Sequence, residues 1–115
     1  SGGKVEASAL ALIPLLLFMA SLATPASAVA HVVGGGHHWS PGVNYTVWAA
    51  GQRFYVQDWL VFYFEKGMYD VVEVRNGTAY ERCVADDPVL NWSRGHSYAM
   101  QLNRTGPYYF ICSRG

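Results

Sequence analysis

The run RFYVQDWLVFYF, residues 53–64, most constrains the fold of this 115-residue chain. In an extended strand its second half has two apolar faces, one with Leu60, Phe62 and Phe64, the other with Trp59, Val61 and Tyr63. Two apolar faces are typical of a strand in the middle of a sheet that is covered on both sides. The run therefore predicts a central strand, buried on each face.

Short β-rich segments recur along the rest of the chain, with turn residues between them. Strands are predicted over residues 30–33, 45–50, 69–74, 79–83, 97–102 and 108–112, with a reversal at Asn76-Gly77 and a long connection over 84–95. Outside the first thirty residues no segment has a sustained helical period. The pattern predicts an all-β domain, either a β-sandwich or a Greek-key barrel.

The first thirty residues have the pattern of a secretory signal peptide. Their apolar stretch, residues 9–23, is shorter than the roughly 20 residues that span a bilayer. Residues 26–28 (Ala-Ser-Ala) and 28–30 (Ala-Val-Ala) are both small-x-small cleavage signals. The missing initiator Met and weak basic region indicate an incomplete N-terminus. We expect a signal over residues 1–30 and, over 31–115, a secreted domain without a transmembrane span.

Four N-x-[ST] sequons are consistent with an extracellular glycoprotein. They begin at Asn44, Asn76, Asn91 and Asn103. The formal net charge is zero and the arginines are scattered singly, so no nucleic-acid partner is predicted. No phosphate-binding glycine loop or nucleophile elbow is present, and the acidic residues favour a solvated loop over an acid/base pair. The chain is therefore not expected to be an enzyme.

Several stretches of the chain, in this order, resemble a phytocyanin, the plant branch of the cupredoxins. They are VVGGGHHW, YTVWAAGQRFYVQDWLVFYF, YDVVEV followed by AYERC, and GPYYFIC. The resemblance runs from about His31 to Gly115 and is strongest to the early nodulin-like proteins. It implies a cupredoxin-like Greek-key β-sandwich of seven or eight strands, secreted and often tethered to the outer face of the plasma membrane. Partners would be unknown cell-wall or plasma-membrane components. Because the last predicted strand ends near Gly115, we expect the final strand to be missing.

The resemblance also implies where copper would bind. Copper-binding phytocyanins hold the metal with two His, a Cys and an axial Met or Gln, a set suited to electron transfer. Here Cys112 stands at the thiolate position, Tyr69 stands where the first His belongs, and the other ligands would follow Gly115. A phenol has a pKa near 10 and is a hard oxygen donor, which suits copper poorly. The four histidines of the chain show no ligand spacing of their own.

We therefore expect no competent copper site and no other cofactor. The leading hypothesis is a non-catalytic cell-surface glycoprotein domain of the early nodulin-like type, which acts in binding or organisation. The alternative is a blue-copper electron-transfer protein whose remaining ligands lie beyond residue 115. A truncated product without a stable fold is a third possibility.

Cys83 and Cys112 are the only cysteines. Two cysteines in a small secreted domain usually pair, and a bridge here would contribute about 3–4 kcal/mol. The resemblance instead implies that Cys83 pairs with a cysteine beyond Gly115, while Cys112 remains a metal ligand. Three arrangements stay open: a Cys83–Cys112 bridge, two free thiols in a fragment of a longer protein, or a bridge between molecules.

Overall fold

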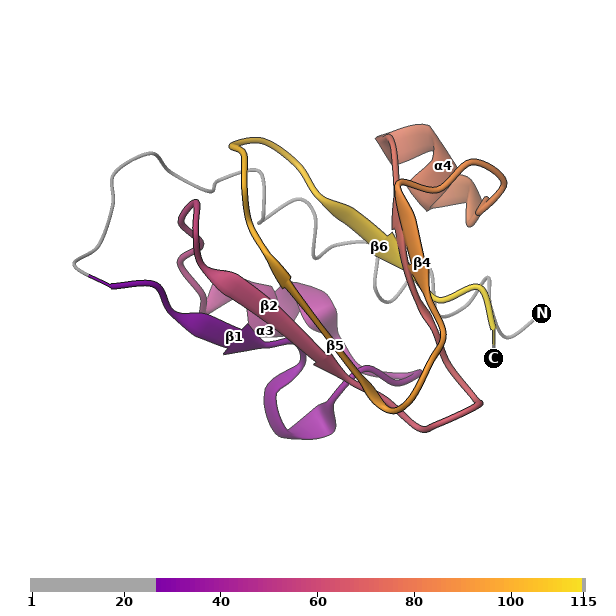
Figure 1. The fold of residues 1–115 in the computed structure, drawn as a ribbon, viewed down its shortest axis with the longest axis horizontal. Helices are drawn as coiled ribbons and strands as arrows, with labels where there is room; N and C mark the ends of the chain where they lie inside the picture. The colour runs from indigo at the N-terminus through magenta and orange to yellow at the C-terminus, as the bar shows by residue number, and fades with distance from the viewer. Residues whose placement is uncertain (1–26, 115) are drawn as a thin grey trace.

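The computed structural model describes residues 27–114, which form two three-stranded sheets packed against each other (Figure 1). The first sheet has the order β1-β2-β5, and the second the order β4-β3-β6. The strands are β1 (Ala30–Val32), β2 (Trp59–Tyr63), β3 (Val71–Val74), β4 (Leu90–Trp92), β5 (Ser97–Gln101) and β6 (Tyr109–Ile111). β1 is parallel to β2, and the other pairs are antiparallel. The predicted β-sandwich is confirmed.

Two segments that were predicted as strands are short helices. They are α3 (Tyr45–Ala50) and α4 (Gly77–Arg82), and a single 3₁₀ turn, η1 (Gly35–His37), precedes them. The side chain of Asn44 accepts a hydrogen bond from the Val47 N–H at 3.2 Å, and that of Asn76 from the Ala79 N–H at 2.8 Å. Both asparagines are therefore helix N-caps, which overrides the strand propensity that follows Asn44. Within the described residues no helix is long and apolar enough to cross a bilayer.

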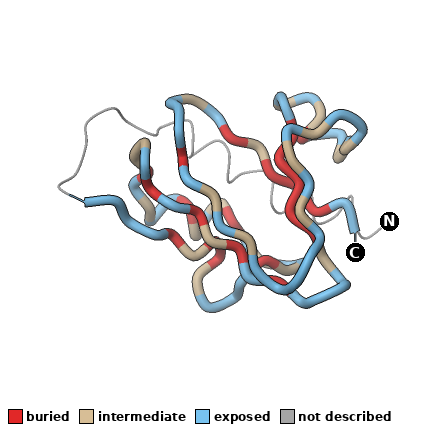
Figure 2. Tube along the Cα trace, in the orientation of Figure 1, coloured by how far each residue is buried: buried red, intermediate tan, exposed pale blue. Residues whose placement is uncertain are grey.

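The main core lies between the two sheets and is largely aromatic. Trp39, only 1% exposed, meets the edge of Phe62 with ring centroids 4.9 Å apart. Phe62 of the first sheet in turn lies 5.1 Å from Phe110 of the second. Figure 2 shows buried positions alternating with more exposed ones along β2, and half-buried positions alternating with exposed ones along β5. The inward-facing side chains of the two sheets interdigitate, and this packing holds the sandwich together.

The second sheet is covered on its outer side by α4. Tyr80 of that helix packs against Val72, Val74 and Ile111 in a smaller apolar cluster. Both faces of β3 are consequently buried along its whole length. β3, and not β2, is the strand covered on both sides.

β2 is central in its sheet, but only its inner face is covered. Leu60 and Phe62 are fully buried, whereas Trp59 and Tyr63 on the opposite face are 41% and 38% exposed. The prediction of two buried faces is wrong because the described helices pack elsewhere. α3 contributes Tyr45 to the core between the sheets, and α4 covers the second sheet.

A buried polar network ties β1 to the loop before β2. Fully buried Asp58 places Oδ2 2.8 Å from Nε2 of His31, whose Nδ1 lies 2.8 Å from Oε1 of Gln52. Asp58 also accepts backbone hydrogen bonds from Val29 at 3.0 Å and Tyr55 at 3.1 Å. A buried carboxylate is tolerated only when its oxygens are hydrogen-bonded, and here two groups from residues 29–31 and one from the loop before β2 converge on one side chain.

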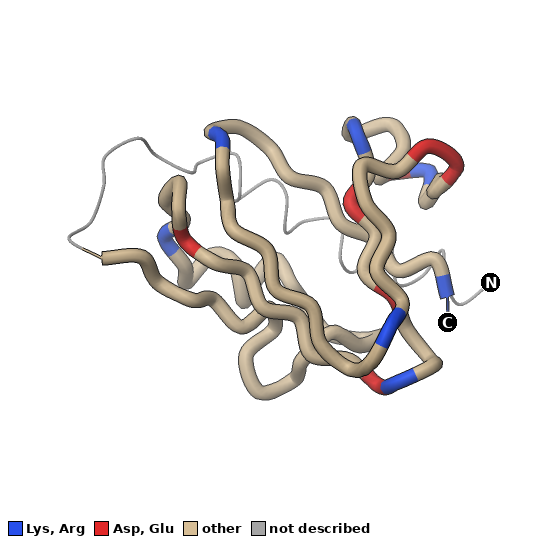
Figure 3. Tube along the Cα trace, in the orientation of Figure 1, with Lys and Arg blue, Asp and Glu red and all other residues tan. Residues whose placement is uncertain are grey.

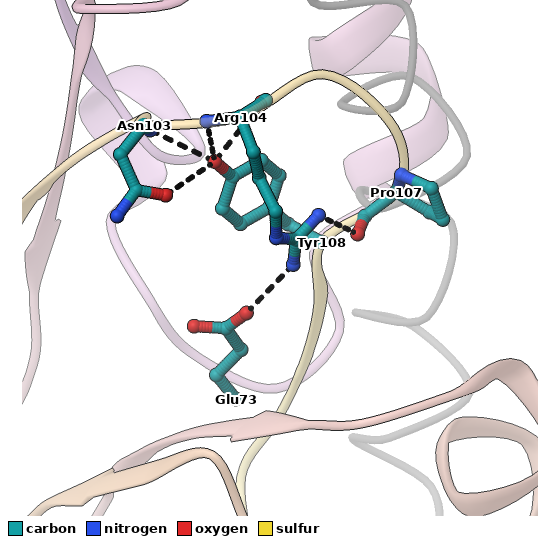
Figure 4. Close-up of polar contacts among 5 residues, drawn as sticks. All are labelled: Glu73, Asn103, Arg104, Pro107 and Tyr108. Carbon is teal, nitrogen blue, oxygen red and sulfur yellow. Dashed lines mark hydrogen bonds and ion pairs between the residues drawn. The ribbon is translucent and has the colours of Figure 1, made fainter.

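A second buried carboxylate, Glu73 of β3, helps to close the β5–β6 connection (Figure 4). Nη2 of Arg104 lies 3.3 Å from Oε2 of Glu73, and Nη1 donates to the Pro107 carbonyl at 2.8 Å. The guanidinium stacks 4.0 Å above the ring centroid of Tyr108. The Tyr108 hydroxyl accepts from the N–H groups of Asn103 and Arg104 at 2.9 and 3.0 Å. The β5–β6 connection is therefore held at Asn103 and Arg104, soon after β5, and at Pro107, shortly before β6.

The buried position of Glu73 predicts a pH dependence of stability. Burial raises the pKa of the Glu73 carboxyl above its ordinary value of 4.5, and the neighbouring Arg104 opposes this shift. A carboxyl with a raised pKa stabilises the fold most below its unfolded pKa and loses that contribution as pH rises through the folded value. We expect the unfolding free energy of the wild type, relative to Glu73→Gln, to fall between pH 4 and 7. A single titrating carboxyl can change this difference in unfolding free energy by no more than about 1.4 kcal/mol per pH unit. Urea denaturation at both pH values tests this, and a pH-independent difference would contradict it.

Candidate functional site

Tyr69 and Cys112 lie at the same end of the second sheet. Antiparallel pairing sets Val72 of β3 opposite Ile111 of β6, so the residues that precede β3 run beside those that follow β6. Asp70, 2% exposed, accepts a hydrogen bond from the Ser113 N–H at 2.7 Å and another from the Ser113 hydroxyl. We call these two hydrogen bonds the Asp70–Ser113 clasp. They join the neighbours of Tyr69 and Cys112, although 43 positions separate Asp70 from Ser113.

The two side chains have different surroundings. Cys112 is 1% exposed and belongs to the main core, where its thiol donates to the Arg114 carbonyl at 2.9 Å. Tyr69 is only partly buried, packs against the same core and lines an open cleft. Trp39 supports this end of the sheet, because its indole N–H donates to the Asp70 carbonyl at 2.8 Å.

The described residues do not fit a blue-copper site. Thiolate and imidazole are the ligands that select copper, and the family resemblance assigns one imidazole position to Tyr69, whose side chain is a phenol. Among residues 27–114 no three His, Cys, Asp or Glu side chains are grouped so that they could hold a metal ion.

The cleft beside Tyr69, which we call the histidine cleft, has a volume of 470 Å³. Its walls include His37, His38, His96, Glu65, Met68 and Tyr63. The Phe64 N–H donates to the His96 carbonyl at 2.9 Å, which holds the β4–β5 turn beside the end of β2. The His38 ring lies 5.5 Å from that of Tyr63. Sequence spacing gave no hint of this grouping, because the three histidines come from η1, the residue after it and the β4–β5 turn.

The two cysteines pack in different parts of the core. Cys83 ends α4 with a left-handed backbone (φ 54°) and contacts the smaller cluster under that helix. Cys112 lies in the main core between the sheets. The choice among the three cysteine arrangements stays a prediction, and a non-reducing peptide map would decide it.

All four sequon asparagines lie on the exposed surface. Asn44 and Asn76 are the N-caps of α3 and α4, Asn91 lies in β4, and Asn103 follows β5. In both N-caps the side-chain oxygen accepts the capping hydrogen bond, whereas glycosylation modifies the side-chain nitrogen. Capping and glycosylation are therefore compatible at these two positions.

Comparison with known proteins gives consistent matches over most of the chain. Residues 39–115 match the family model described as the plastocyanin-like domain. Early nodulin-like protein 17 of Arabidopsis thaliana is 40% identical over 102 residues, 88% of this chain and 59% of the relative. The blue copper protein of Petunia hybrida is 36% identical over 90 residues, 78% of this chain and 33% of the relative. The chain thus spans little more than half the length of early nodulin-like protein 17.

Two solved structures share the fold. Cucumber stellacyanin with Cu²⁺ superposes with a TM-score of 0.68 at 31% identity, covering 77% of this chain and 84% of that structure. Cucumber basic protein, a blue copper protein, gives a TM-score of 0.62 at 30% identity, covering 73% of this chain and 82% of that structure. The β-sandwich described above is therefore of the same type as in these copper proteins.

Proposed function

Because the chain belongs to the phytocyanin family of plastocyanin-like domains, we propose that it is a non-catalytic plant cell-surface glycoprotein domain that acts by binding. Within the family it would be of the early nodulin-like type, without a competent copper site. The observation that carries the proposal is Tyr69 at the position that the family resemblance assigns to the first histidine ligand.

The electron-transfer alternative depends on ligand chemistry. A blue-copper centre needs a deprotonated cysteine and two imidazoles around the metal. With a phenol in place of one imidazole, the remaining soft ligands do not enclose the ion on that side. Copper could then bind weakly at other surface groups, but it would not gain the strong thiolate bond that gives these centres their colour.

Copper titration of the secreted full-length chain tests this proposal. We expect no intense thiolate-to-copper absorption band in the visible region, because Tyr69 cannot complete the ligand set. Cucumber stellacyanin, treated in the same way, is the positive control. A strong blue band that disappears in Cys112→Ser would establish the electron-transfer alternative.

The proposal includes secretion and N-glycosylation. The predicted signal covers residues 1–30, of which residues 1–26 lie outside the part of the chain that the structure describes. The domain would cover residues 31–115. Asn44, Asn76, Asn91 and Asn103 would carry glycans, which their exposure supports. The intact mass of the secreted protein, measured before and after enzymatic N-deglycosylation, tests whether glycans are attached. An unchanged mass would refute glycosylation.

A further inference from the structure

The outer face of the β1-β2-β5 sheet is an uncharged and partly aromatic surface. Trp59, Val61 and Tyr63 of β2 point outward and pair across the sheet with Gln101, Ala99 and Ser97 of β5. Figure 3 shows no Lys, Arg, Asp or Glu on these three strands. We call this surface the outer sheet face. It contrasts with the turns around it, which carry charged residues.

Two aromatic side chains dominate the outer sheet face. Trp59 is 41% and Tyr63 38% exposed, and they lie four residues apart on one strand. This separation corresponds to about 13 Å along β2. An occupant that contacts both rings must therefore span this distance, as an extended chain with a repeated ring-binding group does.

The exposed area limits what can bind there. At the sizes typical of aromatic side chains, the two rings together expose about 200 Å². A stable protein interface buries roughly 800 Å² on each partner. The two aromatic side chains alone therefore fall well short of a stable dimer interface, and their exposed area fits a narrow chain.

The lack of charged side chains on the outer sheet face further limits which kind of ligand can bind there. Anionic membrane surfaces and nucleic acids are held by clusters of Lys and Arg, which the three strands lack. The polar groups on the face are the neutral Ser97 hydroxyl and Gln101 amide, the latter anchored by donation to the Gln57 carbonyl at 3.0 Å. At the Tyr63 end the face adjoins the histidine cleft, which adds further hydrogen-bonding side chains.

We propose that the outer sheet face binds a neutral polysaccharide chain, with Trp59 and Tyr63 as two stacking platforms. A sugar ring presents apolar C–H groups on its faces and hydroxyls around its edge, which matches aromatic rings flanked by neutral polar groups. Asn44, Asn76 and Asn91 lie on elements outside this sheet, whereas Asn103 follows Gln101 of β5 by two residues, beside the Trp59 end of the face. This inference rests on the proposed role of the chain as an extracellular binding domain, and it specifies a neutral polysaccharide as the class of ligand.

The test uses the secreted full-length chain with cellohexaose and hydroxyethyl cellulose as neutral probes and polygalacturonate as an acidic one. Calorimetry and affinity electrophoresis should show binding to the neutral probes. Trp59→Ala and Tyr63→Ala should each weaken binding by about tenfold, the scale of losing one stacking contact. Trp59→Phe should retain most of the affinity. The indole N–H signal of Trp59, assigned by its loss in Trp59→Phe, should shift on addition of cellohexaose.

Val89→Ala is the matched control, since Val89 is 48% exposed and lies outside the first sheet. It should bind like the wild type, and melting curves should show that all four variants are folded. The inference is overturned if no probe binds, if only polygalacturonate binds, or if the alanine variants bind normally. Concentration-dependent dimerisation that Trp59→Ala abolishes would also overturn it, in favour of a second copy. A blue copper band would refute the non-copper proposal without affecting these binding results, so the two failures are distinguishable.

Discussion

Replacement of Asp58 by alanine should lower the free energy of unfolding by about 3–5 kcal/mol, as expected when one partner of a buried charged network is removed. Asp58 is fully buried and accepts hydrogen bonds from two backbone N–H groups, at 3.0 and 3.1 Å, besides its 2.8 Å contact with His31. Without the carboxylate these donors stay buried but lose their acceptor. Urea denaturation followed by far-UV circular dichroism measures the loss.

Two further variants separate burial from charge. Asp58→Asn keeps one acceptor oxygen and should cost less than the alanine substitution. Asp87→Ala removes a carboxylate whose side chain is 84% exposed and paired with Arg75 at 3.2 Å, and should change stability by no more than about 0.5 kcal/mol. Equal losses in Asp58→Ala and Asp87→Ala would refute the structural role of the network.

In the arrangement with two free thiols, replacement of Asp70 by alanine should make Cys112 react roughly tenfold to hundredfold faster with iodoacetamide under native conditions. Asp70 holds Ser113, next to Cys112, by two hydrogen bonds. Hydrogen bonds to charged groups contribute about 1.5–3 kcal/mol, so their loss should raise the population of locally opened molecules by that factor. The Trp39 hydrogen bond goes to the Asp70 backbone and is retained in the variant.

Mass spectrometry of the labelled peptides distinguishes Cys112 from Cys83. Ser113→Ala removes only the hydroxyl contact and leaves the 2.7 Å backbone contact, so its effect should be intermediate. A Cys112 labelling rate that is the same in wild type and Asp70→Ala would show that the clasp does not limit access to the thiol.

The two helices show where strand propensity fails as a predictor. Residues 45–50 are rich in β-branched and aromatic side chains, but Tyr45 and Ala49 are four apart and both enter the core, as on one face of a helix. Asn44 supplies the N-cap, so a six-residue helix forms against its intrinsic preference. At Asn76 the same capping interaction replaces the hairpin turn that Asn-Gly usually forms.

The candidate site could be predicted only in part. The order of the aromatic and cysteine-containing stretches was sufficient to predict a cupredoxin-like sandwich, and the matches over residues 39–115 agree. The Asp70–Ser113 clasp and the histidine cleft could not be predicted, because they depend on contacts between distant segments. Likewise, the two apolar faces of β2 predicted burial, whereas the structure leaves the face with Trp59 exposed.

The contact between Val29 and Asp58 has a consequence for maturation of the chain. Cleavage after Ala28 would turn the Val29 amide into an ammonium group, 3.0 Å from the buried carboxylate, and so strengthen this hydrogen bond by charge. Cleavage after Ala30 would instead remove Val29 and the first residue of β1. The two signals are equivalent in sequence but not in the folded protein, which favours cleavage after Ala28 and hence a signal two residues shorter than the predicted 1–30. N-terminal sequencing of the secreted protein identifies the product, and a chain that begins at His31 would contradict this preference.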